Sequence, residues 1–141
     1  MLEPEVRARI DEEFTSSPFH AFLCLTFATD ADGAVRVGMP FREELVSDPT
    51  VPYLHGGVIG SLLDIAGDYA IALTLGRGVP TIDMRVDYLK VAGREALTAT
   101  ARIVRLGRSI GVADAEVMNQ KGEVIAIGRI LYSTRDPNPP R

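Results

Sequence analysis

The sequence of 141 residues has one cysteine, no tryptophan and no block of lysine or arginine. A single cysteine excludes an internal disulfide framework and a zinc site built from cysteines, and it is typical of a reducing compartment. Nineteen acidic residues against fifteen basic ones give a net charge of −4, which argues against a nucleic-acid partner. Cys24 lies in the apolar run AFLCLTF, so we expect it to be a small core side chain.

Long uncharged runs are also missing from the chain. The N-terminal residues MLEPEVRARIDEEF are charged from the third residue, and no stretch approaches 18 uncharged apolar residues. Hydrophobic side chains make up 46% of the sequence, which suffices for one globular core. We expect one soluble, cytoplasmic domain over residues 1–134 with no membrane partner, and a disordered, proline-rich tail over residues 135–141.

Hydrophobic spacing predicts two helices and six strands. Val6, Ile10 and Phe14 recur every fourth residue after a proline, which indicates a short amphipathic helix over residues 4–15. Residues 57 to about 75 are apolar on nearly every side and are followed by Gly76 and Gly78, as expected for a long buried helix. Strand patterns cover residues 20–29, 34–39, 81–89, 95–106, 109–118 and 123–134.

The connections between these strands are short, which favours antiparallel neighbours, and the first two strands are expected to form a hairpin. The fold class is therefore α+β, with a six-stranded, mostly antiparallel sheet wrapped around one long central helix. Such a sheet leaves an edge and an outer face uncovered, so we expect at least a dimer. Residues 40–54 contain three prolines and form a loop of the kind that often lines a site.

The stretch HGGVIGSLLD at residues 55–64 contains the most informative chemistry. Gly56 and Gly57 open the buried helix, and the free N–H groups of a first helical turn attract partial negative charge. These two N–H groups are expected to bind a substrate carbonyl and to stabilise its oxyanion, a contribution of about 3–4 kcal/mol per donor in enzymes. Asp64 is a carboxylate in an apolar segment, so it needs either a partner or a function.

Asp64 and Gly56 are eight residues apart, or about 12 Å along one helix, so they cannot act on one small group within a single chain. An antiparallel copy of the helix across a two-fold axis would bring Asp64 of one chain level with Gly56 of the other. Each dimer would then contain two composite sites, with Asp64 as nucleophile or as general base for water.

HGG, the aspartate nine residues after its histidine, the strand TIDMRVDYL and the turn GRSI at residues 107–110 together resemble the PaaI-like acyl-coenzyme A thioesterases of the hotdog-fold superfamily. The resemblance extends over about residues 41–132. It implies a hotdog fold, hydrolysis of acyl-coenzyme A, and dimers that pair into tetramers. It also implies that the enzyme needs no metal and no cofactor other than the coenzyme A of its substrate.

The resemblance assigns roles to individual positions. Asp64 matches the catalytic carboxylate, and Gly56 matches the residue whose N–H holds the thioester oxygen. His55 is implied to shape the loop beside Gly56, and Thr81 matches a hydroxyl position that helps to place the attacking water. The implied contacts to coenzyme A are Arg108 and Ser109, with Lys90 and Arg105 as weaker candidates.

Asp48 and Pro49 stand where many members of this family have an asparagine or glutamine that orients the substrate or water. Proline has no N–H, and an ionised Asp48 could accept a hydrogen bond from the substrate but could not donate one to a carbonyl. This departure favours a second hypothesis, a protein that binds acyl-coenzyme A without hydrolysing it. A dehydratase or hydratase on the same fold is a third, but it would need a catalytic histidine, and only His55 is available.

Simpler interpretations remain open for several residues. Asp64 could be a structural carboxylate, and His55 could be a hydrogen-bonding spacer before the helix. Asp68 lies one helical turn beyond Asp64 and is expected to point to solvent or to an interface. His20 is expected to be structural. The acyl group is expected to be medium-chain or aryl, in a tunnel with apolar walls from Phe41, Ile59, Leu63 and Tyr69.

Overall fold

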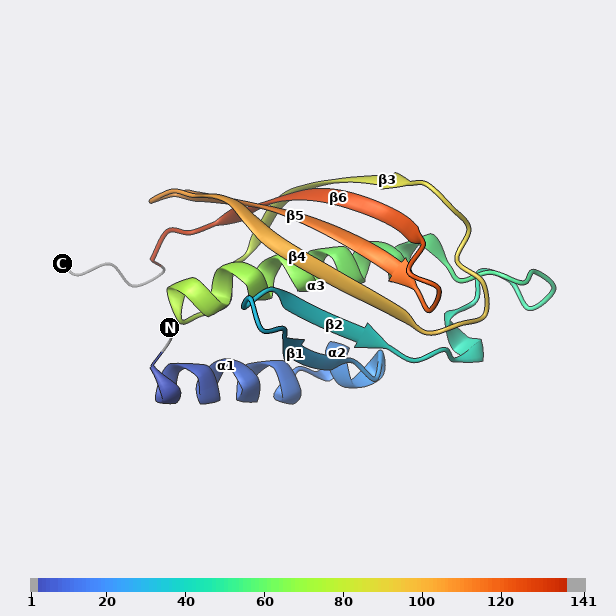
Figure 1. Cartoon of the computed structure of the whole chain (residues 1–141), viewed down its shortest axis with the longest axis horizontal. Coiled ribbons are helices and arrows are strands. Elements are labelled where there is room, and N and C mark those ends of the chain that lie inside the picture. Colours follow the sequence, from blue (N-terminus) through green and yellow to red (C-terminus); the bar gives the residue numbers. More distant parts are fainter. Residues whose placement is uncertain (1–2, 137–141) are drawn as a thin grey trace.

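The structure, a computed structural model, describes residues 3–136, so residues 137–141 of the expected tail lie outside the described part. The helices are α1 (Pro4–Ser16), α2 (Pro18–Phe22) and α3 (Gly56–Leu75), and a 3-10 turn spans Glu43–Leu45. The strands are β1 (Thr26–Thr29), β2 (Val35–Met39), β3 (Thr81–Tyr88), β4 (Leu97–Leu106), β5 (Ile110–Asn119) and β6 (Val124–Ser133). The sheet curves over α3, while α1 lies beside β1 (Figure 1).

The six strands form one sheet in the order β1-β2-β4-β5-β6-β3, and every neighbouring pair is antiparallel. The predicted α+β hotdog architecture is therefore confirmed. One predicted pairing is wrong, because β3 and β4 are not neighbours. β3 pairs with β6 at one edge, and residues 89–96 cross from that edge to β4 in the sheet interior. The buried Ala92 anchors this crossing, and its carbonyl accepts a hydrogen bond from the Leu54 N–H.

The central helix α3 has the predicted bounds to within one residue. His55 occupies its N-cap, and Gly76 ends it in the left-handed conformation, with φ of 72°, which glycine adopts at little cost. By length and composition alone α3 could cross a membrane, but most of it is buried inside the fold. Its apolar surface therefore serves as the core against which the sheet packs.

The first predicted strand is wrong over its first six residues. Residues 18–22 are helical because Pro18 occupies the first turn and the Ser17 side chain accepts a hydrogen bond from the His20 N–H. Cys24 then adopts φ of 54° and is exposed, so it is not the core residue that its apolar neighbours predicted. His20 is structural, as expected, because its ring packs against Phe14 and Tyr69 and its Nδ1 bonds the Phe14 carbonyl at 2.9 Å.

Candidate functional site

Asp64 lies in the middle of α3 on the side that faces β3. The hydroxyl of Thr81, the first residue of β3, donates a hydrogen bond to Asp64 Oδ1 at 2.8 Å. Asp64 is half-buried and Thr81 is exposed, so the pair lies at the protein surface. The structure thus brings together the predicted catalytic carboxylate and the predicted hydroxyl that helps to place water.

The N–H groups of Gly56 and Gly57, in the first turn of α3, differ in whether they form a hydrogen bond. The Gly57 N–H donates to His55 Nδ1 at 2.9 Å, so it is not free to bind a substrate as the sequence predicted. None of the hydrogen bonds found among residues 3–136 engages the Gly56 N–H. Because a helix N-terminus attracts negative charge, Gly56 remains the group that is suited to hold an oxyanion.

His55 therefore acts as an N-cap, in line with the spacer hypothesis. Replacing His55 by alanine is expected to lower the free energy of unfolding by about 1 kcal/mol, because the Gly57 N–H loses its acceptor. His55→Asn keeps a side-chain acceptor and is expected to recover most of this loss. Urea denaturation of the three proteins measures the difference, and an alanine variant as stable as the native protein would contradict this role.

Strand β3 runs along α3 and contacts it at three levels. The Thr81 side chain bonds Asp64, and the Met84 side chain lies next to Gly60. The Tyr88 ring lies next to Gly56, and its hydroxyl donates a hydrogen bond to the Gly56 carbonyl at 2.8 Å. Residues 56, 60 and 64 share one face of α3 because they are four residues apart. We call this surface the α3–β3 edge; it consists of Gly56, Gly60, Asp64, Thr81, Met84 and Tyr88.

The predicted contacts to coenzyme A lie at opposite ends of the chain's own fold. Arg105, Arg108 and Ser109 lie in or beside the β4–β5 turn, near the C-terminal end of α3, where Gly111 meets Ile71. That end is about 22 Å from Gly56 along the helix. Lys90 follows β3 near the start of α3, and its ammonium group forms an ion pair with Glu123.

Asp48 lies in an exposed turn of the loop before α3. Its carboxylate accepts hydrogen bonds from the Thr50 hydroxyl and from the Thr50 N–H, the latter at 2.8 Å. These bonds hold the pKa of Asp48 below its ordinary value. The side chain is therefore an ionised acceptor and supplies no donor to a carbonyl. Its proposed contact with the substrate stays a prediction.

Asp68 does not point to solvent as predicted. Its Oδ1 accepts a hydrogen bond from the Val79 N–H at 2.9 Å, and the carboxyl group is half-buried beneath the loop that follows α3. Burial raises the pKa of Asp68 to about 7, and the negative charges of Asp64 and Glu13 act in the same direction. The spacing of Asp64 and Asp68 indicated that two like charges could raise the pKa of one of them. Burial, the largest cause of the shift, could not be predicted because the loop packs over Asp68 only in the folded chain.

The raised pKa of Asp68 predicts a pH dependence of stability. Because Asp68 binds its proton more tightly in the folded than in the unfolded chain, its contribution is fully present below about pH 4 and is lost as pH rises through about 7. Asp68→Asn keeps the acceptor for Val79 and cannot ionise. We expect the variant to gain up to about 4 kcal/mol in stability relative to the native protein between pH 4 and pH 8, because the pKa is raised from 3.8 to about 7.

Urea denaturation at pH 4, 6 and 8 checks this expectation. Asp32→Asn is the matched control, since Asp32 is exposed in the β1–β2 turn. An Asp68→Asn variant whose stability follows the native pH profile would show that Asp68 ionises as it does in the unfolded chain.

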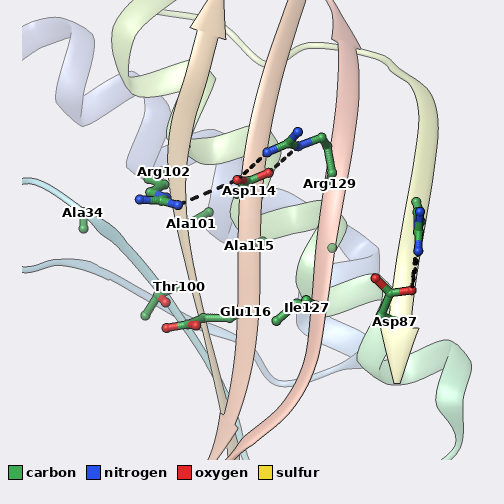
Figure 2. A pocket seen from close by; sticks show the side chains of 12 residues that line it. Ala34, Asp87, Thr100, Ala101, Arg102, Asp114, Ala115, Glu116, Ile127 and Arg129 are labelled. Atoms are coloured by element: carbon green, nitrogen blue, oxygen red, sulfur yellow. Dashed lines mark hydrogen bonds and ion pairs between the residues drawn. The ribbon is translucent and has the colours of Figure 1, made fainter. Parts of the chain in front are cut away.

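A hollow with a volume of about 800 Å³ lies on the face of the sheet opposite α3. Figure 2 shows Arg102 and Arg129 pointing toward Asp114, and Arg129 binds both of its carboxylate oxygens, at 2.7 and 2.8 Å. None of the predicted site residues lines this hollow. Ile59, Leu63 and Tyr69, which were expected to line an acyl tunnel between the helices, are buried in the core of the single chain.

Comparisons with known proteins agree on one family. The sequence profile of the thioesterase superfamily matches residues 52–126. The medium/long-chain acyl-CoA thioesterase YigI of Salmonella typhimurium strain LT2 is 36% identical over 130 residues, which cover 82% of this chain and 84% of YigI.

Solved structures share the fold along most of the chain. A Shewanella oneidensis protein related to the thioesterase superfamily aligns with a TM-score of 0.84 and 31% identity, covering 92% of this chain and 95% of that one. The Escherichia coli PaaI protein, from the phenylacetic acid degradation operon, aligns with a TM-score of 0.78, covering 94% and 95%. At 23% identity, PaaI supports the fold alone.

Proposed function

Because this chain belongs to the thioesterase superfamily, we propose that it hydrolyses thioesters of coenzyme A. Membership supports thioester hydrolysis, and the similarity to YigI supports acyl-coenzyme A as the substrate. In this proposal Asp64 of one chain and the Gly56 N–H of the partner chain act on the same thioester carbonyl.

One observation carries the proposal: a free N–H at the start of α3 and a hydroxyl-bonded carboxylate lie on one exposed edge, eight residues apart. A two-fold axis that pairs α3 with an antiparallel copy brings each carboxylate to the other chain's free N–H. The exposed apolar side chains of β3 favour such pairing, since Ile82 and Tyr88 are more than half exposed at 54% and 55%.

The chemistry follows from these groups. The Gly56 N–H and the helix N-terminus stabilise the negative charge that develops on the thioester oxygen. Asp64 either attacks the carbonyl carbon itself or takes a proton from a water that attacks it. The carbon–sulfur bond then breaks, and the coenzyme A thiolate leaves and takes up a proton. If Asp64 attacked directly, the acyl group is now bound to it as a mixed anhydride, which water hydrolyses to release the acid and restore the carboxylate. Thr81 holds Asp64 Oδ1, so the carboxylate keeps one orientation during the reaction.

We propose a medium-chain, long-chain or aryl acyl group. YigI, which is 36% identical to this chain, is a medium/long-chain acyl-CoA thioesterase, and the apolar side chains of β3 offer a surface for such a group. Incubation with acetyl, octanoyl, palmitoyl and phenylacetyl thioesters of coenzyme A tests this, with free thiol as the readout. Fastest release from the acetyl thioester would overturn the chain-length proposal.

The composite site requires a dimer, and pairing of dimers into a tetramer is part of the same proposal. Light scattering coupled to gel filtration measures the mass in solution. A stable monomer that hydrolyses thioesters would contradict a site shared between chains.

A protein that binds acyl-coenzyme A without hydrolysing it is the second candidate, and Asp48 favours it. Its carboxylate is ionised and held by Thr50, so the donor that many relatives place before HGG is missing. Tight binding of every thioester in the panel without release of thiol would select this function over hydrolysis.

A further inference from the structure

Each of the two proposed reacting groups on α3 is held through its backbone by a tyrosine. The Tyr132 hydroxyl donates to the Asp64 carbonyl at 2.6 Å, and the Tyr88 hydroxyl donates to the Gly56 carbonyl at 2.8 Å. The chain has four tyrosines, and among the hydrogen bonds of residues 3–136 these two hydroxyls are the ones that reach α3. The backbone position of both groups therefore depends on neighbouring strands.

Tyr132 holds Asp64 from inside the fold. It lies on β6, is fully buried, and pairs directly with Thr81 across the β3–β6 ladder. Thr81 thus bonds the Asp64 side chain, while Tyr132 bonds the Asp64 main chain. Gly67 provides the space, because a Cβ there would lie 2.3 Å from the Tyr132 hydroxyl oxygen.

The Tyr132 hydroxyl donates to the Asp64 carbonyl, which in a regular helix also accepts a hydrogen bond from the Asp68 N–H. It therefore acts on the turn of α3 that carries Asp64. Burial, and then the charges of Asp64 and Asp68, raise the pKa of Tyr132 far above its ordinary value, so the hydroxyl stays a donor.

Tyr88 holds the N-terminal end of α3 through the Gly56 carbonyl. Its ring lies over Gly56 and its hydroxyl lies near Gly60, and a Cβ on either glycine would be in ordinary contact with Tyr88, at 3.5 and 3.6 Å. The carbonyl that it bonds belongs to the same peptide unit as the Gly57 N–H, which donates to His55. Hydrogen bonds arranged in series polarise one another, so the turn that presents the Gly56 N–H is held on both sides.

We propose that Tyr88 and Tyr132 are positioning residues, which fix the segment from Gly56 to Asp64 against the sheet so that each Asp64 meets the partner chain's Gly56 at reacting distance. This inference rests on the proposed thioesterase function. A misplacement of about 1 Å at a reacting group costs about 10²-fold in rate, so small shifts of α3 matter. Three of the nine residues from Gly56 to Asp64 are glycines, namely Gly56, Gly57 and Gly60, and they have no side chain with which to resist such shifts.

Tyrosine-to-phenylalanine variants test the proposal with matched controls from the same chain. Tyr88→Phe and Tyr132→Phe each remove one hydroxyl, and we expect kcat to fall about tenfold in each, with KM within about twofold of the native value. Tyr53→Phe, which removes an exposed tyrosine hydroxyl, and Asp32→Asn, in the exposed β1–β2 turn, are the controls, and both should keep the native kcat. Urea denaturation confirms that each variant is folded.

Amide hydrogen exchange supplies a readout that needs no activity. We expect faster exchange over residues 56–60 in Tyr88→Phe and over residues 64–68 in Tyr132→Phe, and no change there in the controls. A folded Tyr88→Phe variant with native kcat and native exchange would overturn the inference, as would faster exchange with an unchanged kcat. If the native protein releases no thiol from any thioester, the proposed function fails by itself, whereas the exchange data still decide whether the hydroxyls hold α3.

Discussion

Asp64→Asn is expected to lower kcat for thiol release from acyl-coenzyme A by about 10³-fold. The asparagine has the same size and its amide oxygen can still accept the Thr81 hydroxyl, so the local structure should persist. The amide cannot attack the thioester and cannot take a proton from water. Steady-state thiol release with the preferred thioester measures the loss, and KM should change little because the acyl group and coenzyme A keep their contacts.

Asp32→Asn serves as the charge-matched control and should retain the native rate. An Asp64→Asn variant that hydrolyses thioesters at the native rate would remove Asp64 from the mechanism, and the structural interpretation of this carboxylate would then stand. Binding of the substrate by an inactive but folded Asp64→Asn variant would add support for a chemical role.

Gly56→Pro is expected to lower kcat by about 10²–10³-fold, because proline removes the proposed oxyanion donor and little else. Gly56 is the first residue of α3, where proline fits a helix, and His55 has the extended conformation that precedes proline, with φ of −65° and ψ of 135°. Gly56→Ala is the control, since alanine keeps the N–H and its Cβ would meet Tyr88 at an ordinary 3.5 Å. Equal rates for the proline and alanine variants would exclude Gly56 as the donor.

Mixing the two inactive variants tests whether the site is shared. In a dimer of one Asp64→Asn chain and one Gly56→Pro chain, one site combines the intact Asp64 of the second chain with the intact Gly56 of the first. Random assembly of equal amounts should therefore restore about one quarter of the native activity, since half of the dimers are mixed and each has one of two sites intact. No recovery, in a mixture shown to exchange subunits, would contradict a site that combines Asp64 of one chain with Gly56 of the other.

Local patterns in the sequence determined much of this protein. The long apolar helix, its glycine stop at Gly76, five of the six strands to within two residues and the α+β class all follow from periodicity, which depends on neighbours along the chain. The stretch from His55 to Asp64 also indicated its own chemistry, because the positions of a helix start and of a carboxylate eight residues later follow from helical geometry alone. The match to the thioesterase superfamily then confirmed the family that this stretch resembles.

Only the tertiary structure decided which groups are already engaged. The imidazole of His55 accepts a hydrogen bond from the Gly57 N–H, and the Gly56 N–H stays free. Residue spacing in the sequence does not show which of these two adjacent N–H groups is engaged. Asp68 faces the loop after α3, and β3 crosses to the far edge beside β6, where Tyr88 and Tyr132 reach the helix. The contacts of Asp68, Tyr88 and Tyr132 join residues that are 11 to 68 positions apart in the sequence. They therefore depend on how side chains pack once the sheet has closed over α3.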